Sequence, residues 1–248
     1  MMKKHFKKLV SLALSAIMVV GMSITTFAAE VQPAATTVGT LTIFSSNDGG
    51  SSSWDTSGHA FIAFKNSSSS SVTVGGLNVG AGHEITFGTW GNKSQHTGIW
   101  YNLESYFANN ASAYGNRVSL SMSVTQSNID TINGIISKND KWSLTNNCSS
   151  FAVKVWNSVS SKTLSAGTPN TPTSLMSSIK SKSGYQTGRS IGNTTPIGYV
   201  SNGSFVTVTM NKAASISKTN DIAVMDTTVG NAEFITPIDM NPYSYTAN

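Results

Sequence analysis

The chain has 248 residues, of which 39% are hydrophobic and only 11% are charged, and it contains one cysteine. A single cysteine excludes an internal disulfide framework, so the fold must be held by its core. The formal net charge of +5 is largely a property of the first 29 residues, and so it does not argue for a nucleic-acid partner.

Residues 1–29 are predicted to form a secretory signal peptide. Lysines at positions 3, 4, 7 and 8 precede an apolar run from Leu9 to about Ile24, and Thr26-Phe27-Ala28-Ala29 supplies small residues for cleavage before Glu30. The apolar run is short and interrupted, which argues against a membrane anchor. Without this segment 12 basic and 11 acidic residues remain. We therefore expect a secreted protein, extracellular or cell-wall associated, with no nucleic-acid partner and no membrane contact after cleavage.

The rest of the chain suits one domain with a short linker and a C-terminal extension. We expect the linker over residues 30–40, the main domain over 41–184, and an extension over 185–248 with one or two strands and irregular parts. Strands are predicted over 205–210 and 222–225.

The first half of the domain alternates like an antiparallel meander. Strands are expected over 41–44, 58–65 and 83–90, with 71–79 returning as the hairpin partner of 58–65. In the second strand His59, Phe61, Ala63 and Lys65 share one face, and Ala60, Ile62 and Phe64 share the other.

Helices are predicted to dominate the second half. A short one is expected over 102–107, followed by a strand over 117–124 and a helix from the cap Thr125 to about Lys138. Asn147 is expected to cap the next helix, and Thr171 with Pro172 opens another that runs to about Ser181. These patterns predict an α+β fold in which an antiparallel sheet packs against a few helices.

Cys148 lies at the first position of the helix capped by Asn147. There the helix dipole and unpaired amides favour a thiolate, and the same amides can stabilise an oxyanion. The polar neighbours Asn146, Ser149 and Ser150 suit the mouth of a site. The alternative is a buried cysteine that acts as an apolar filler.

A thiol nucleophile needs a base, and three histidines remain after the signal. His59, at the start of an apolar strand, is the best candidate, with a structural strand-end histidine as the alternative. His83 follows a predicted turn and is expected on the surface. His96 lies in a polar loop between Trp90 and Trp100 and is a candidate third catalytic residue. No pair of these residues has metal-ligand spacing, so no metal and no cofactor is expected.

The order of these residues resembles the permuted branch of the papain-like cysteine hydrolases, which includes NlpC-type cell-wall amidases and lecithin–retinol acyltransferase-like enzymes. Gly58-His59-Ala60-Phe61-Ile62 lies on a strand before Asn147-Cys148-Ser149-Ser150-Phe151. The second stretch is similar to the Asn-Cys-Glu-His-Phe signature of the acyltransferase-like members at its first, second and fifth positions. The resemblance covers roughly residues 41–180 and implies a papain-like sheet and helix, Cys148 as nucleophile and His59 as base.

The resemblance also implies a third polar residue that orients the histidine. His83, Thr89, Asn92 and His96 lie in the right part of the chain, and the loop that carries His96 or Asn92 is preferred. Trp90, Asn92, Trp100 and Asn147 are candidate substrate-binding residues, with core packing as the alternative for the tryptophans.

The expected function is therefore that of a secreted bacterial cysteine amidase or peptidase. Because Ser149 and Ser150 depart from the acyltransferase-like signature, and because the chain carries an export signal, peptidoglycan or another peptide amide is the expected substrate. The alternatives are a secreted surface or binding protein without catalysis, and a secreted toxin or effector with the same chemistry.

Overall fold

The computed structural model describes residues 36–47, 58–210 and 233–234, which form a mixed α+β fold. The strands are β1 (Thr37–Ser46), β2 (His59–Asn66), β3 (Val72–Val74), β4 (Leu77–Val79), β5 (Glu84–Trp90), β6 (Gly98–Tyr101), β7 (Val118–Thr125), β8 (Gln186–Thr187), β9 (Gly198–Ser201), β10 (Ser204–Thr209) and β11 (Glu233–Phe234). The helices are α2 (Leu103–Asn110), α3 (Gln126–Lys138), α4 (Cys148–Val159) and α5 (Pro172–Lys180). The predicted α+β class is confirmed.

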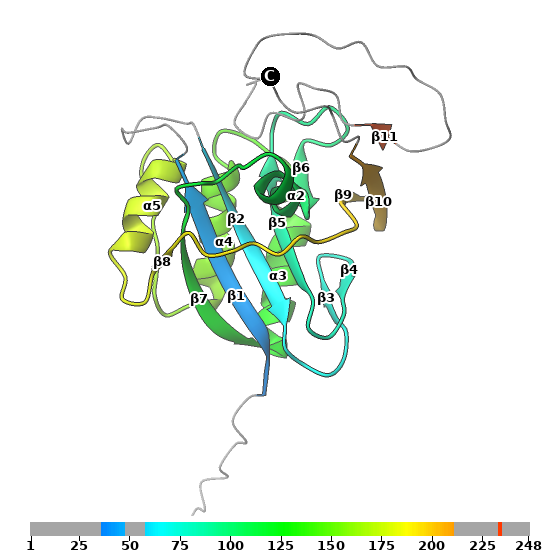
Figure 1. The fold of residues 1–248 in the computed structure, drawn as a ribbon, viewed down its shortest axis with the longest axis horizontal. Helices are drawn as coiled ribbons and strands as arrows, with labels where there is room; N and C mark the ends of the chain where they lie inside the picture. Colours follow the sequence, from blue (N-terminus) through cyan, green and yellow to red (C-terminus); the bar gives the residue numbers. More distant parts are fainter. Residues whose placement is uncertain (1–35, 48–57, 211–232, 235–248) are drawn as a thin grey trace, which may run out of the picture. The chain divides into compact units, whose positions relative to one another are not determined.

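Nine strands form one sheet in the order β11-β10-β9-β6-β5-β2-β1-β7-β8 (Figure 1). Every pair in this sheet is antiparallel except β10 with β11. The central strands β1 and β2 pair with Ile43 opposite Ile62 and Ser46 opposite His59. His59 therefore lies at one end of the two central strands, where its side chain can meet the loops.

The prediction that residues 71–79 pair with β2 is wrong. Gly75 and Gly76, both with positive φ, turn the chain within this stretch and divide it into β3 and β4, which pair with each other in a separate two-stranded sheet. Glycine adopts positive φ without the steric cost that other residues meet. The place beside β2 is taken by β5, with Ile62 opposite Phe87.

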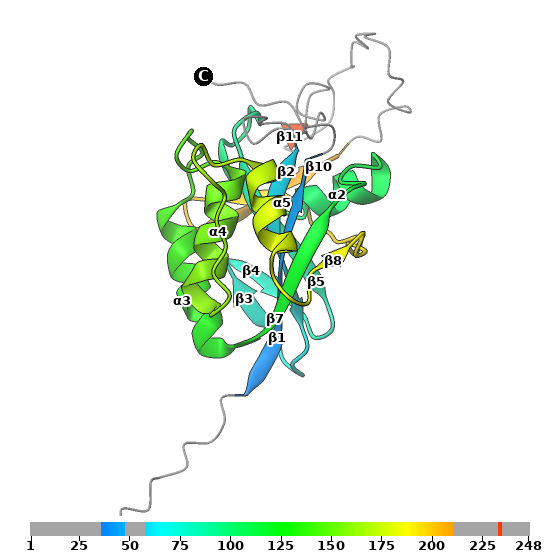
Figure 2. The same ribbon diagram turned by 90° about the vertical axis from the view of Figure 1, so that its left-hand side faces the viewer.

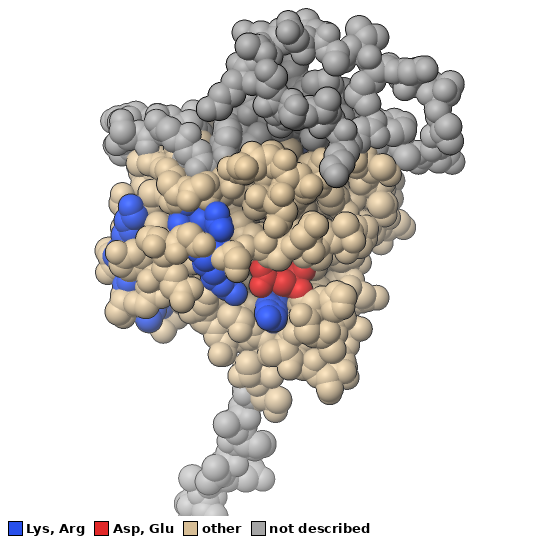
Figure 3. Space-filling model, viewed as in Figure 1, with Lys and Arg blue, Asp and Glu red and all other residues tan. Residues whose placement is uncertain are grey.

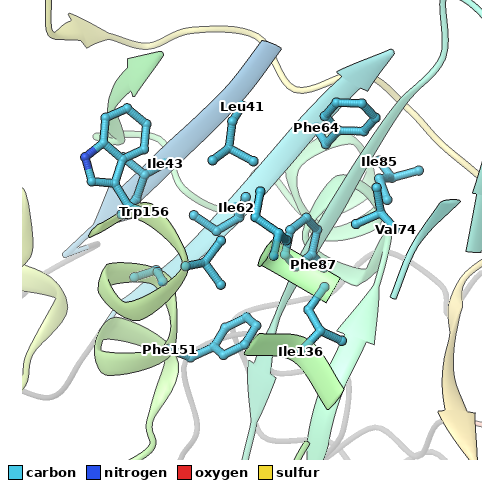
Figure 4. Packing of buried hydrophobic residues seen from close by; sticks show 14 of the residues in the cluster. Leu41, Ile43, Ile62, Phe64, Val74, Ile85, Phe87, Ile136, Phe151 and Trp156 are labelled. Carbon is cyan, nitrogen blue, oxygen red and sulfur yellow. The ribbon is translucent and has the colours of Figure 1, made fainter. Parts of the chain in front are cut away.

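Three helices, α3, α4 and α5, cover one face of the sheet (Figure 2). Each begins where its cap predicts, because the side chains of Thr125, Asn147 and Thr171 accept hydrogen bonds from backbone amides of the first turn. Phe151 and Trp156 of α4 point from this layer toward the sheet (Figure 4). The helix predictions for this part of the chain are confirmed.

The other face of the sheet carries α2 and the segment 188–197, which runs from β8 to β9 (Figures 1 and 2). Its core contains aromatic side chains, among them Phe44, Phe61, Trp90, Phe107 and Tyr114. The two predicted faces of β2 are confirmed, since Phe61 and Ala63 belong to this cluster while Ala60, Ile62 and Phe64 belong to the helix side.

The C-terminal segment contributes strands to both ends of the main sheet. β8 pairs with β7, whereas β9 pairs with β6 and with β10. The predicted strand over 205–210 is confirmed as β10, and β1 begins at Thr37, inside the predicted linker. The predicted signal peptide and the strand over 222–225 lie outside the described residues. No helix within the described ranges is long and apolar enough to cross a membrane.

Candidate active site

Cys148 is the first residue of α4, directly after the N-cap Asn147. The Oδ1 atom of Asn147 accepts a hydrogen bond from Ser150 N at 3.0 Å, and its Nδ2 atom donates to Asn170 O at 2.8 Å. Asn147, a candidate substrate-binding residue, therefore ties the start of α4 to the loop before α5. This cap holds the thiol at the positive end of the helix dipole, which favours an anion.

His59 brings the two halves of the site together. Its imidazole is fully buried, is hydrogen bonded to the carboxylate of Glu104, and lies near enough to Cys148 for the charge and hydrogen bonding of that thiol to raise the pKa of the ring. Nε2 lies 3.1 Å from Glu104 Oε1. The ring packs against Trp90 with centroids 4.1 Å apart. The structure thus brings Cys148 and His59 together.

Glu104 is a buried carboxylate in the first turn of α2. Besides His59, it accepts hydrogen bonds from Trp90 Nε1 at 2.9 Å on Oε1 and from Thr86 Oγ1 at 2.9 Å on Oε2. Both donors lie on β5, so this strand holds the carboxylate in one orientation. A buried carboxylate is tolerated when its oxygens are satisfied in this way.

Gly88 provides the space that the His59–Glu104 pair occupies. A Cβ atom at this position of β5 would lie 2.6 Å from Glu104 Oε1 and 3.3 Å from His59 Nε2. Any larger residue would compete with the carboxylate for its place beside the imidazole. The glycine is therefore part of the geometry of the site.

The surroundings of His59 change its proton affinity in opposing directions. Burial lowers the pKa of His59, because it penalises the charged ring. The negative charge and hydrogen bonding of Cys148 raise the pKa, and those of Glu104 raise it further. The result is a pKa of about 9, against the ordinary 6.5. The contribution of Cys148 acts through the negative charge of the thiolate. The thiolate and the imidazolium therefore stabilise each other, so the charge of one group affects the proton affinity of the other.

His96, predicted as a third catalytic residue, is not the partner of His59. Its Nε2 atom lies 2.9 Å from Asp140 Oδ1, and its ring stacks on Tyr199 with centroids 4.6 Å apart. Asp140 Oδ1 also accepts from Ile99 N at 2.7 Å. His96 thus joins the loop before β6 to the loop that leads toward α4, and the place beside His59 belongs to Glu104.

The remaining candidates are distributed around this centre. Trp90 contacts both His59 and Glu104, but its side chain is fully buried, as is that of Trp100, whose Nε1 atom donates to His96 O at 2.8 Å. Asn92 and Thr89 are buried, and His83 is exposed as predicted. Trp90 is the one of these side chains whose contacts with both His59 and Glu104 are described above.

Sequence reasoning missed Glu104. One signal was available, because the chain has only 11 acidic residues and this one lies in a short predicted helix beside the inward-facing Leu103 and Phe107. An acid within an apolar helix face is rarely buried unless it has a partner. The sequence does not reveal that this partner is a histidine 45 positions earlier.

Neither a metal cluster nor a surface hollow defines another centre here. Within the described ranges, no group of three or more His, Cys, Asp or Glu side chains is placed to hold a metal ion. Two surface hollows of about 600 and 580 Å³ are lined largely by residues 185–195. Cys148, His59 and Glu104 do not line either of them. We take Cys148, His59 and Glu104 as the candidate site because their chemistry, not the shape of the surface, sets them apart.

Comparisons with protein-family models, curated proteins and solved structures find no match to this chain. The residues of the site are therefore the basis for inferring its function.

Proposed function

We propose that the chain is a cysteine amidase or peptidase related to the permuted papain-like hydrolases. The observation that carries this proposal is the buried His59 ring, which lies near the Cys148 thiol and is hydrogen bonded to the carboxylate of Glu104. A nucleophile, a base and a group that orients the base are the parts that covalent acyl transfer needs. The order of His59 before Cys148 and an antiparallel sheet against the Cys148 helix support the permuted papain-like assignment.

In the first half of the proposed reaction, the Cys148 thiolate attacks the carbonyl carbon of an amide. A C–S bond forms and the oxygen becomes an anion, which amides at the start of α4 are oriented to stabilise. His59 then gives its proton to the leaving nitrogen, the C–N bond breaks, and an amine departs. A thioester on Cys148 remains, together with a neutral imidazole.

In the second half, neutral His59 takes a proton from water as the water oxygen attacks the thioester. The C–S bond breaks, a carboxylic acid leaves, and the imidazolium–thiolate pair is restored. Glu104 holds the ring in the orientation that both proton transfers require and stabilises its positive charge. Since the carboxylate is buried, no water competes for the ring nitrogen that it binds.

For the substrate we propose a peptide amide of the cell wall. The predicted export signal would place the enzyme outside the cytoplasm, where peptidoglycan stem peptides are the abundant amides of an exposed surface. A secreted toxin or effector with the same catalytic residues would act on a peptide amide of another cell.

The experiment that tests the mechanism is the pH dependence of Cys148 alkylation by iodoacetamide, read by mass spectrometry. Cys148 is the only cysteine, so one modified site reports on one thiol. We expect alkylation to follow a thiolate that forms well below the ordinary pKa of about 8.5, and we expect His59→Ala to move the profile back toward that value. A thiol that titrates normally in both proteins would contradict the mechanism.

The titration of His59 gives a second readout, by NMR of the ring. We expect the pKa of about 9 in the native chain and a lower pKa in Cys148→Ala, because the anion that raises it is gone while burial remains. Since the folded pKa lies above the unfolded 6.5, the imidazole taken alone stabilises the fold fully below about pH 6.5 and loses that contribution as the pH rises through about 9. An unchanged His59 pKa in Cys148→Ala would contradict the pairing.

One observation favours a binding protein without catalysis as the second candidate. Cys148 is only 2% exposed, as expected for a structural thiol. The two candidates differ in the same alkylation experiment, because a structural thiol reacts slowly at every pH and a catalytic one reacts fast near neutrality.

A further inference from the structure

The segment 188–197 crosses the face of the sheet opposite α3 and α4 (Figure 1). At its start Arg189 donates hydrogen bonds to Thr42 Oγ1 and to Ser121 Oγ, and its Nη2 atom lies 3.7 Å from Glu84 Oε2. Figure 3 shows basic and acidic side chains side by side on this face. Arg117 holds the backbone of the same segment, with its Nε atom 2.5 Å from Arg189 O. These contacts fix the segment to β1, β5 and β7.

The same segment makes four hydrogen bonds to α2 and its N-cap. Asn102 Nδ2 donates to Pro196 O at 2.7 Å, and Asn109 Nδ2 donates to Ile191 O at 3.1 Å. Between them, Ser105 Oγ donates to Gly192 O and accepts from Thr194 N at 2.8 Å. The contacts thus reach both ends and the middle of the helix.

α2 needs these outside contacts because its own sequence does little to stabilise a helix. It spans eight residues, a length at which an isolated helix is marginal in water. Its N-cap, Asn102, has a left-handed backbone and makes no side-chain cap bond. Instead the Asn102 side chain binds Thr86 N at 3.1 Å and Pro196 O, so the start of the helix is held from outside.

We propose that residues 188–197 are a positioning element of the active site: they hold α2 where Glu104 meets His59. This inference rests on the proposed function. Ser105 is the central link, because it adjoins Glu104 in the chain, is fully buried, and both donates to and accepts from the segment. Part of the C-terminal extension thereby belongs to the catalytic machinery although it supplies no reacting group.

Two variants of α2 test this role against a matched control. Ser105→Ala removes both hydrogen bonds at the centre. Asn109→Ala removes the bond to Ile191 O from an exposed position, together with a bond to Ser105 O within the helix. Asn110→Ala is the control, because Asn110 is also exposed at the end of α2 but donates only to Tyr106 O within the helix. Thermal unfolding verifies that each variant is folded.

The readout is the pH profile of Cys148 alkylation. If α2 loosens, Glu104 stabilises imidazolium less well and the thiolate forms at higher pH. Since each pKa unit changes the thiolate fraction about tenfold below the pKa, we expect alkylation at pH 6 to slow by roughly three- to tenfold in Ser105→Ala. Asn109→Ala is expected to slow it by about twofold, and Asn110→Ala to leave it unchanged.

The experiment distinguishes failure of the positioning role from failure of the proposed function. If the native chain shows a low thiol pKa and both folded variants keep its profile, the positioning role is contradicted while the Cys–His mechanism stands. If the native thiol titrates near 8.5, the proposed function itself fails. Should Ser105→Ala not fold, Asn109→Ala against Asn110→Ala decides the question, and equal profiles in that pair overturn the inference.

Discussion

The two faces of the central sheet are built by different means. On one face α3, α4 and α5 pack apolar stripes such as Phe151 and Trp156 against the strands, and each helix starts at its own cap (Figure 4). On the other face α2 has no side-chain cap and is held by hydrogen bonds from a segment about 90 residues later. One face is specified locally, whereas the other depends on contacts between distant parts of the chain.

The candidate site lies where these two kinds of construction meet. Cys148 belongs to the locally specified face, as the first residue of a well-capped helix, and Glu104 belongs to the other face. His59, on the central strand β2, joins them. Changes on the two faces should therefore have different signatures: changes under the helices should alter stability alone, whereas changes near α2 should also alter the reactivity of the Cys148 thiol.

Removal of the Glu104 side chain has the largest expected effect. In Glu104→Ala the donors on His59, Trp90 and Thr86 lose their common acceptor in a buried place. We expect unfolding free energy to fall by about 3–5 kcal/mol, measured by urea denaturation, and Cys148 alkylation at pH 6 to slow by at least tenfold.

Glu104→Gln separates the charge of this residue from its shape. The amide keeps an oxygen for the buried donors, so most of the stability should return, but the negative charge that helps to raise the pKa of His59 is gone. We expect alkylation at pH 6 to remain slow in this variant. A native alkylation profile in a folded Glu104→Gln would show that the carboxylate charge plays no part.

Ile132→Ala is the counterpart on the helix face. Ile132 of α3 is fully buried in the core beneath the helices. Loss of its side chain leaves a cavity, which should lower the unfolding free energy by about 2–4 kcal/mol. Because no polar contact of the site is touched, the alkylation profile of the folded protein should match that of the native chain. A shifted profile would mean that the two faces are coupled more tightly than proposed.

The sequence predicts the locally specified face of the sheet better than the face that depends on distant contacts. The Thr125, Asn147 and Thr171 caps are local signals, and they place three helices and the Cys148 thiol correctly. The alternation of β2 also places His59 on the correct face. These patterns need only the few residues around them.

The sequence does not predict what depends on pairing at a distance. The sequence favours the loop of His96 as the source of the partner of His59. Glu104 is the residue that reaches the ring, because contacts from β5 and from the segment 188–197 hold the start of α2. The residues 71–79 likewise read as one strand, although the turn at Gly75 divides them. In both cases the deciding contact lies outside the window in which a pattern can be read.

Gly88→Ala tests whether close approach of β5 to the site matters. The new Cβ would meet Glu104 Oε1 at 2.6 Å, so the carboxylate must move away from His59. We expect a loss of about 1–3 kcal/mol in unfolding free energy from overpacking, together with slower alkylation at pH 6. Gly134→Ala in α3 is the control, since a Cβ there meets nothing within 4 Å; it should leave the profile unchanged and not lower stability. If Gly88→Ala also kept the native profile, the close fit around Glu104 would be irrelevant to the thiol.

The smallest expected effect comes from Thr86→Val, which removes one of the two β5 donors to Glu104. Oε2 loses its hydrogen bond at 2.9 Å and Ser105 N loses its longer bond of 3.3 Å to the same hydroxyl, whereas Oε1 keeps both His59 and Trp90. A lost bond to a charged acceptor should reduce stability by about 1.5 kcal/mol, measured against Thr73→Val, whose hydroxyl binds only Asn78 in the small β3–β4 sheet. The oxygen that faces His59 is still held, so the pKa of the thiol should hardly change. Since the thiolate fraction changes about tenfold per pKa unit, we expect the rate of alkylation at pH 6 to change by less than about twofold. A change as large as that of Gly88→Ala would instead mean that both carboxylate oxygens must be anchored for His59 to be oriented, and that β5 and α2 act on the thiol as a single unit.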